Sequence, residues 1–230
     1  MSLTYNRKIE LLHALAESNG AVLFGTCDVQ EMKKNFLYQP HEIQDLNYAV
    51  VFGIRLSYSV LQSIENAPTL IYKLHHEEVN RQLDRLALLI SMKIHEFGYQ
   101  ALPVPASYMI DPKKLLGHVS HRHIAVRAGL GWIGRNNRLV TKEYGSQIRL
   151  CTVLTTMSLP TPTEQKFGCG DCKACIPLCP AKAIWNTSQQ FDLKRCYEQI
   201  KTFRKKTKLE ASLCGICTKA CPGESGAKLK

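Results

Sequence analysis

Eight of the ten cysteines in this 230-residue chain lie between residues 169 and 221, in two runs of nearly the same spacing. The first run, residues 169–180, reads C-x2-C-x2-C-x3-C-P, and the second, residues 214–222, reads C-x2-C-x3-C-P. The other two cysteines, Cys27 and Cys151, stand alone. A disulfide framework would cross-link the whole chain, whereas disulfides among these cysteines would connect only residues near its C-terminal end. Metal ligation is therefore the better interpretation.

The spacing of the first run is that of a 4Fe–4S protein with two clusters. Three thiolates on one tight loop reach three irons of one cube, while the fourth, ahead of the proline, ligates the other cube. The second run has Ala211 in place of its first cysteine, and Cys196 between the runs completes the count. Zinc also suits C-x2-C pairs, but it explains neither the three-cysteine loop nor the trailing Cys-Pro. We expect one cluster on Cys169, Cys172, Cys175 and Cys221, and the other on Cys179, Cys196, Cys214 and Cys217.

Apolar patterning predicts strands alternating with helices in the first two thirds of the chain. Residues 71–97 carry apolar side chains at helical spacing without glycine or proline, and Gly98 is a typical helix end. Residues 138–141 and 147–155 suggest a hairpin with its turn at 143–146. Strands are expected at residues 21–26, 48–54 and 99–104.

A Pro/Thr-rich stretch at residues 159–163 suggests a linker between two domains. The expected fold class is α+β/α/β. An N-terminal α/β cofactor domain, residues 1–158, would precede a bacterial-type dicluster ferredoxin-like domain, residues 159–230.

The formal net charge of +11 falls to roughly +7 when two clusters of charge about −2 are counted. This excess is compatible with an acidic partner, with RNA or with solubility alone. The basic run at residues 201–208 suggests either a solvated face or a docking site for a low-potential electron donor, such as flavodoxin or ferredoxin. No apolar stretch is long enough for a membrane span and no signal segment is evident, so we expect a cytoplasmic protein without membrane contact.

Residues 128–134 contain a literal G-x-G-x-x-G. A dinucleotide site needs a strand before these glycines, a helix after them and an acid about 20 residues later. Here residues 120–127 look helical and a strand follows, so nicotinamide binding is disfavoured. The alternative is a glycine-rich turn with Trp132 packed in the core.

The segment 128–136, together with 144–146 and 153–155, closely resembles the epoxyqueuosine reductase family. The order of the domains and the lone Cys196 resemble it as well. That family binds cobalamin and is related to the corrinoid reductive dehalogenases. The resemblance implies that residues 1–158 are corrinoid-binding-like and that cobalamin is reduced through the clusters. The residues it implies at the cofactor are Gly131, Trp132, Gly134, Arg135, Asn136 and Ser146. The alternative is that the arginine is solvated and the asparagine caps a turn.

The chain departs from the family where a catalytic aspartate is expected, because it has Leu115 there. The candidate proton donors are therefore Asp111, Tyr108 and His121. Two other interpretations are open for His121 and its neighbours His118 and His123. The three could bind zinc, or they could be ordinary surface or packing residues. The helical-repeat domain that the family uses on tRNA is also missing after Cys221.

Two hypotheses follow from these residues. The first is an iron–sulfur oxidoreductase that passes electrons through two 4Fe–4S clusters to cobalamin, for reduction of a small-molecule or nucleotide-derived substrate. The alternative is a dicluster electron-transfer or accessory protein that binds a redox partner and no corrinoid. A third option is an enzyme that acts on tRNA, which would require salt-sensitive RNA binding.

Overall fold

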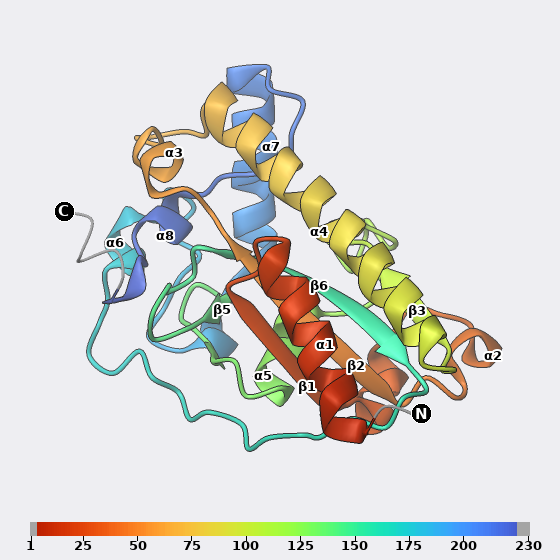
Figure 1. Ribbon diagram of the computed structural model, residues 1–230. Coiled ribbons are helices and arrows are strands. Elements are labelled where there is room, and N and C mark those ends of the chain that lie inside the picture. The colour runs from red at the N-terminus through yellow and green to blue at the C-terminus, as the bar shows by residue number, and fades with distance from the viewer. Residues whose placement is uncertain (1–3, 225–230) are drawn as a thin grey trace. The chain divides into compact units, whose positions relative to one another are not determined.

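The computed structural model describes residues 4–224 and shows a mixed α/β fold with two compact units (Figure 1). The first unit combines the chain up to Ile54 with residues 80–130 and 149–164. The second combines residues 55–79 and 131–148 with the chain from Gln165 onward. Each unit thus draws on both sides of the expected boundary at residues 158 and 159. Segments 55–79 and 131–148 belong to the same unit as the cysteine runs.

A four-stranded sheet with the order β1-β2-β6-β3 forms the centre of the first unit. The strands β1 and β2 are antiparallel, with Phe24 opposite Phe52, and β3 and β6 are antiparallel, with Leu102 opposite Leu154. Both faces of the middle strands are buried, which explains their almost continuous apolar sequences. The strands are β1 (Leu23–Asp28), β2 (Tyr48–Arg55), β3 (Ala101–Val104) and β6 (Ile148–Thr155).

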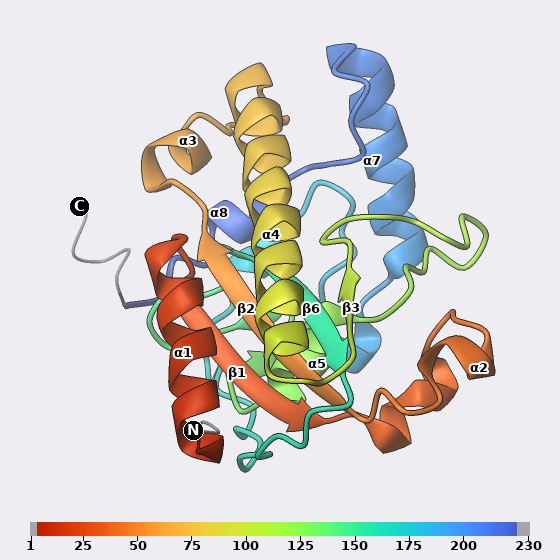
Figure 2. The same cartoon turned by 45° about the vertical axis from the view of Figure 1, so that its right-hand side comes forward.

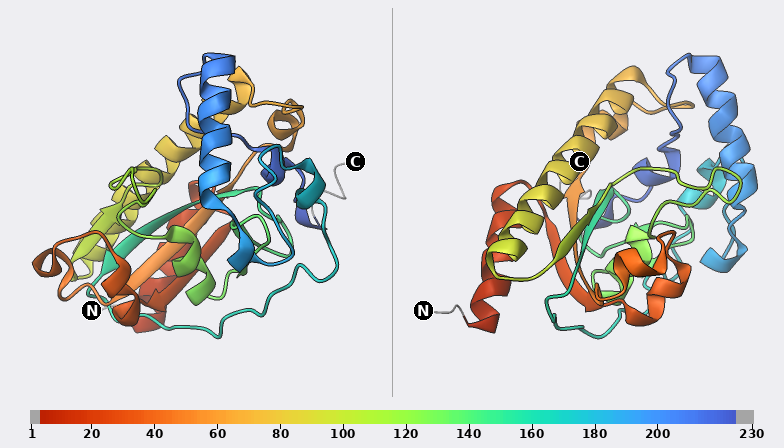
Figure 3. Two further views of the ribbon diagram at one scale, coloured as in Figure 1. Left: turned by 180° about the vertical axis from the view of Figure 1, so that it is seen from behind. Right: turned by 90° about the vertical axis from the view of Figure 1, so that its right-hand side faces the viewer.

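Helices α1 (Tyr5–Ser18) and α4 (Leu70–Glu96) cover one face of this sheet, and α5 (His121–Arg127) lies on the other face against β1 (Figures 2 and 3). Helix α4 was expected over residues 71–97, and this prediction is confirmed. Its buried stripe is Leu83, Leu86, Ile90 and Ile94, each fully buried. Beyond its end Gly98 has φ +84°, a conformation that favours glycine. The short helices η1 (Gln30–Asn35) and α2 (Pro40–Ile43) follow β1.

The second unit consists of short elements around the cysteine runs. Helix α8 packs against α6 and against α3. A two-stranded hairpin pairs β4 with β5, with Trp132 opposite Val140. The elements are α3 (Tyr58–Gln62), β4 (Trp132–Ile133), β5 (Leu139–Val140), α6 (Cys175–Leu178), η2 (Ser188–Gln190), α7 (Leu193–Thr207) and α8 (Ile216–Lys219).

The expected hairpin between residues 138–141 and 147–155 is wrong, because β5 pairs with β4 instead. The intervening turn is closed by mutual backbone hydrogen bonds of Thr141 and Gly145, both 2.9 Å. A Cβ on Gly145 would lie 2.1 Å from the Cys221 carbonyl oxygen, so the turn is shaped by contact with the second cysteine run. The three strands expected in the first unit are confirmed within about two residues at their ends.

Across residues 4–224, none of the helices is both long enough and apolar enough to cross a membrane.

Truncating Phe52 tests the sheet as the core of the first unit. This side chain is fully buried, and Phe52→Ala should lower the free energy of unfolding by about 3–5 kcal/mol through lost burial and a residual cavity. Denaturant unfolding followed by far-UV circular dichroism measures the loss. The exposed Val22→Ala is the control and should change the midpoint little. Equal effects of the two substitutions would contradict this account of the core.

Candidate functional site

All eight clustered cysteines belong to the second unit and have free thiols. Helix α6 begins at Cys175, α7 carries Cys196 and α8 carries Cys217. The loop ahead of α6 provides Cys169 and Cys172, and the second of these has an exposed side chain. Three short helices and one loop therefore bring together cysteines that are far apart in the sequence.

Charge interactions place four of these thiols in one set, which we call group one: Cys169, Cys172, Cys175 and Cys221. Cys175 interacts with Cys169 and Cys221. Cys221 interacts with Cys169 and Cys172. Three of the four come from a single tight loop and the fourth from the end of the second cysteine run.

The other four thiols form a second set, group two: Cys179, Cys196, Cys214 and Cys217. Cys196 interacts with Cys179 and Cys217, and Cys214 interacts with Cys196 and Cys217. Among the thiols, Cys175 interacts most strongly with Cys217 of group two, ahead of Cys221 and Cys169, so the two groups are neighbours within the unit. The sequence spacing assigns the same two sets of four as cluster ligands, and this assignment stays a prediction.

Crowding of the thiols has an electrostatic cost. Burial, followed by the neighbouring thiols, raises the pKa of Cys175 to about 12 and the pKa of Cys196 to about 11. Burial also raises the pKa of Cys214 to about 12. Ionised thiolates at these positions therefore need positive charge nearby, which a metal centre provides when it displaces the thiol protons.

The groups are too widely spaced for a single ion. Among residues 4–224, no three His, Cys, Asp or Glu side chains converge as the ligands of one metal ion would. Four thiols around a four-iron cube stand further apart than the ligands of one ion, since each thiol binds a different iron.

Polar hydrogens point at sulfur in both groups. In group one the Trp132 indole N–H donates to the Cys169 Sγ at 3.3 Å. In group two the Ala183 backbone N–H donates to the Cys179 Sγ at 3.4 Å, and the Arg138 side chain donates to Cys217. Hydrogen bonds to sulfur are typical of iron–sulfur sites, where they help to set the reduction potential.

The glycines of residues 128–134 are explained by packing. A Cβ on Gly131 would lie 2.2 Å from the Val140 carbonyl oxygen, and a Cβ on Gly134 would lie 2.4 Å from the Val140 Cγ2 and 3.5 Å from the Cys169 Sγ. Helix α5 precedes these glycines, and strand β4 lies between Gly131 and Gly134, whereas a dinucleotide-binding turn has a strand before its glycines and a helix after them.

Arg135 is buried with two of its donors unused. Its Nη2 donates to the Gly170 carbonyl at 2.8 Å, and its guanidinium lies 5.2 Å from the centre of the Phe167 ring. Its Nε and Nη1 are buried and have no hydrogen-bond partner in the described part of the chain. A buried arginine with free donors is suited to an anionic or carbonyl-bearing ligand.

Asn136 and Ser146 support a cysteine. The Asn136 Nδ2 donates to the Ser146 Oγ at 3.0 Å, and the Ser146 hydroxyl donates to the thiol of Cys221. The Ser146 N–H also donates to the Cys221 carbonyl at 3.0 Å. Both side chains are almost fully buried. Of the residues expected at the cofactor, these two therefore contact group one directly or through one hydrogen bond.

The three candidate proton donors belong to the first unit. Tyr108 is 69% exposed. The Asp111 Oδ1 accepts hydrogen bonds from the backbone N–H groups of Lys113 and Lys114, both 2.9 Å, so this carboxylate closes its own turn. Leu115 within that turn has φ +59°, an unusual value for a residue other than glycine.

His121 has both ring nitrogens engaged. The Nε2 donates to the Pro105 carbonyl at 3.0 Å, and the Nδ1 accepts from the Thr152 hydroxyl at 2.8 Å. Burial lowers the pKa of His121 to about 4, and the positive charge of Arg149 acts in the same direction. The ring is therefore neutral near pH 7 and fixed in one tautomer.

The other two histidines have separate roles. His118 precedes α5 rather than lying on it, with its Nδ1 3.0 Å from the Leu37 carbonyl and its ring stacked on Tyr38. The Nδ1 of His123 lies 2.7 Å from the Ser120 hydroxyl. His118 and His121 do not lie on one helix, since α5 begins at His121.

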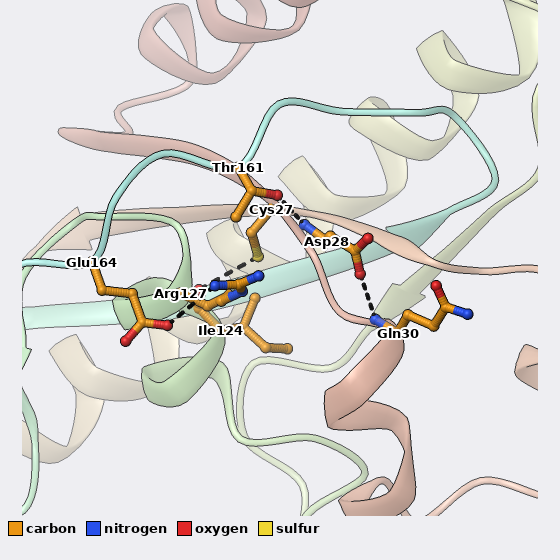
Figure 4. Close-up of polar contacts among 7 residues, drawn as sticks. All are labelled: Cys27, Asp28, Gln30, Ile124, Arg127, Thr161 and Glu164. Carbon is orange, nitrogen blue, oxygen red and sulfur yellow. Dashed lines mark hydrogen bonds and ion pairs between the residues drawn. The ribbon is translucent and has the colours of Figure 1, made fainter.

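The two lone cysteines are buried. Cys27, on β1, donates through its Sγ to the Ile124 carbonyl at 3.7 Å, and burial raises its pKa to about 12 (Figure 4). Beside it, the Asp28 N–H donates to the Thr161 Oγ1 at 2.7 Å, fastening the segment after β6 to β1. Burial also raises the pKa of Cys151 to about 12. Both are packing thiols rather than nucleophiles.

Sequence reasoning missed Arg138 and Gln147. Gln147 is fully buried, and its Nε2 donates to the carbonyls of Thr218 and Lys219 at 3.4 and 3.2 Å, which anchors α8 and its Cys217. A glutamine at the start of an apolar strand is an unusual residue and was the one available signal. The partners of both residues lie in the distant cysteine runs.

The segment containing both cysteine groups has a known counterpart. Residues 168–224 match the model of a 4Fe-4S double cluster binding domain. The second unit is thus built around an iron–sulfur domain for two 4Fe–4S clusters.

Curated relatives match a larger part of the chain than this segment. An epoxyqueuosine reductase of Lactococcus garvieae (strain Lg2) is 32% identical over 160 residues, which are 66% of this chain and 42% of that protein. The chain is therefore a homologue of the epoxyqueuosine reductases, and it spans less than half the length of the first curated relatives that it matches.

Two solved structures share the fold. A reductive dehalogenase described as B12-dependent has a TM-score of 0.74 at 20% identity, covering 96% of this chain and 33% of that chain. An epoxyqueuosine reductase crystallised with an epoxyqueuosine-modified tRNA stem loop has a TM-score of 0.61 at 20% identity, covering 95% and 65%.

The neutral His121 predicts a specific pH dependence of stability. The unfolded chain binds a proton on this ring below about pH 6.5, whereas the folded chain does so near pH 4. Stability should therefore fall as the pH falls through this window, by on the order of 2 kcal/mol from this group. His121→Gln should flatten the dependence in denaturant unfolding between pH 7 and 4.

The matched control is His13→Gln, at an exposed position on α1. It should leave the dependence of the wild-type protein unchanged. A His121→Gln protein with the full wild-type slope would show that another group is responsible.

Proposed function

We propose that this protein is an iron–sulfur reductase in which two 4Fe–4S clusters serve a cobalamin cofactor. The observation that supports the proposal is the gathering of eight free thiols in the second unit, with N–H donors directed at sulfur. Group one would hold the first cluster and group two the second. When bound, the clusters supply one-electron transfer and cobalamin supplies a cobalt centre that reduces a substrate.

Arg135 supports the cobalamin part of the proposal. A corrinoid carries a phosphate and peripheral amides, which are acceptors for charge-assisted and neutral N–H donors. The Nε and Nη1 of Arg135 are buried donors without a partner in the described residues, and they lie in the segment of the glycine motif. Within this proposal Arg135 binds the cofactor, while Trp132, Asn136 and Ser146 orient cysteine ligands next to it.

The glycines have a steric part in the same arrangement. Gly131 and Gly134 allow the hairpin backbone to approach Val140 more closely than a side chain would permit, and Gly134 lies beside Cys169. In our proposal this close approach gives a cofactor access to the backbone near group one. Gly131, Trp132, Gly134, Arg135, Asn136 and Ser146 thus remain the proposed cofactor-side residues.

The substrate class follows from the relatives. One is described as a dehalogenase and another is crystallised with an epoxyqueuosine-modified tRNA stem loop. We propose reduction of a small-molecule or nucleotide-derived substrate, with tRNA as the less favoured form. Tyr108, Asp111 and His121 remain the proposed proton donors. A low-potential flavodoxin or ferredoxin is the proposed electron source, and the basic helix α7 is its proposed docking element.

The ligand assignment predicts the iron content of cysteine variants. Cys196→Ala removes one ligand of group two and should lower the iron content of the anaerobically reconstituted protein from about eight to about four per chain. Cys151→Ala is the matched control, a buried cysteine of the first unit, and should keep about eight. Eight irons retained in Cys196→Ala would remove this residue from the ligand set.

Cobalamin binding is tested by retention on a desalting column. With both clusters reconstituted, added cob(II)alamin should stay with the protein in a stoichiometric amount and give a base-off Co(II) EPR signal. Arg135→Gln should weaken retention at least tenfold, because two buried donors lose their charge.

The control is Lys142→Gln, a substitution of the same charge change at a side chain that is 80% exposed. Cobalamin that washes through while both clusters stay intact would instead support the dicluster electron-transfer protein without a corrinoid. Retention that is equal in both variants would exclude Arg135 from the cofactor site.

A further inference from the structure

Helix α8 carries or adjoins a cysteine of each group. Cys217, of group two, lies within the helix, and Cys221, of group one, follows shortly after its end. The helix has only four residues, and a helix of this length is not stable in isolation. The position of both cysteines therefore depends on the contacts that α8 makes with other parts of the second unit.

The start of α8 rests on the segment of residues 55–79, which belongs to the same unit. Gly215, the residue before the helix, has φ +85°, a conformation that favours glycine. A Cβ there would lie 2.6 Å from the Tyr72 Cε1 and 2.7 Å from the Ile64 Cδ1, and both of these side chains are buried. The backbone at the start of α8 is therefore in direct contact with residues 64 and 72.

The end of α8 is tied to the same segment by a lysine. The Lys219 Nζ donates to the Ile64 carbonyl at 2.6 Å and to the Gln62 carbonyl at 3.2 Å. These two carbonyls lie at the C-terminal end of α3, where a helix leaves backbone acceptors without partners of its own. A lysine at this end of a helix makes charge-assisted hydrogen bonds, so the ammonium of Lys219 caps α3.

Gln147 holds the same residue from another segment. Its Nε2 donates to the carbonyls of Thr218 and Lys219 at 3.4 and 3.2 Å. Residue 219 is thus bound twice, through its carbonyl by Gln147 and through its ammonium by the end of α3. Hydrogen bonds of a charged group stabilise more than those of a neutral amide, so the ammonium is the stronger of the two ties.

We propose that Lys219 is a positioning residue for both clusters, because its ammonium binds the end of α3 and thereby fixes Cys217 and Cys221 where they ligate iron. The inference rests on the ligand assignment of the proposed function. A cluster loses iron when a ligand-bearing segment opens locally, and removing a tether raises the population of the open form. Lys219 therefore limits how readily the clusters release iron.

The test is the rate at which the reconstituted protein gives up iron to an excess of chelator under anaerobic conditions, followed by the absorbance of the iron–chelator complex. Lys219→Met keeps an unbranched apolar stem and removes the ammonium, so it should release iron about tenfold faster or more. Lys219→Arg keeps the charge and the N–H donors, and its rate should stay within about threefold of the wild-type rate.

The matched control is Lys173→Met in the first cysteine run. Lys173 lies between Cys172 and Cys175, so it is as close to cluster ligands in the sequence as Lys219 is, but its side chain is exposed. This variant should release iron at the wild-type rate. An acceleration equal to that of Lys219→Met would overturn the inference, because any loss of charge beside the cysteines would then have the same effect.

The other outcomes separate the inference from the proposed function. A wild-type protein that cannot be loaded with about eight irons overturns the ligand assignment itself. With the wild type loaded, an unchanged rate in Lys219→Met overturns the inference alone, and so does equally fast release from Lys219→Met and Lys219→Arg. If Lys219→Met cannot be loaded, Lys219→Gln decides, because its shorter neutral side chain should release iron faster than Lys219→Arg, and equal rates would overturn the inference.

Discussion

The structure of the second unit depends on holding eight thiols close together. Ionised sulfurs repel one another and burial disfavours their charge, as the raised pKa values of Cys175, Cys196 and Cys214 show. A small unit with few regular elements tolerates this because cluster irons offset the charge and cross-link the chain. Short helices such as α6 and α8, with four residues each, would be marginal alone and gain their order from the ligands they carry.

The need to hold the thiols close together also restricts the conformation of the β4–β5 hairpin. A Cβ on Gly131 would clash with the Val140 carbonyl oxygen and a Cβ on Gly134 with the Val140 side chain, so side chains are excluded at both positions. Around these glycines, Trp132 and Arg138 extend to different cysteine groups. The G-x-G-x-x-G sequence resembles a dinucleotide-binding motif, but in the structure its glycines are required by close packing within the hairpin.

Patterns with a local cause could be predicted from the sequence. Helix α4 followed from an uninterrupted apolar period and a terminal glycine. The assignment of the cysteines to two clusters stays a prediction from spacing, because cube geometry dictates which thiolates reach the same irons. The hairpin partner of β5 could not be predicted, since the Cys221 backbone shapes the turn that follows it. Arg138 was missed for the same reason: its thiol neighbours are distant in sequence.

The three candidate proton donors in the first unit differ in their hydrogen bonds and in their exposure. His121 has one N–H at neutral pH and gives it to the Pro105 carbonyl, so delivering that proton would break a bond that also fixes its tautomer. The Asp111 Oδ1 accepts hydrogen bonds from two backbone N–H groups of its own turn. Tyr108 is 69% exposed. Of the three candidates, Tyr108 therefore has the most accessible side chain, while the hydrogen bonds of Asp111 and His121 are already used within the fold.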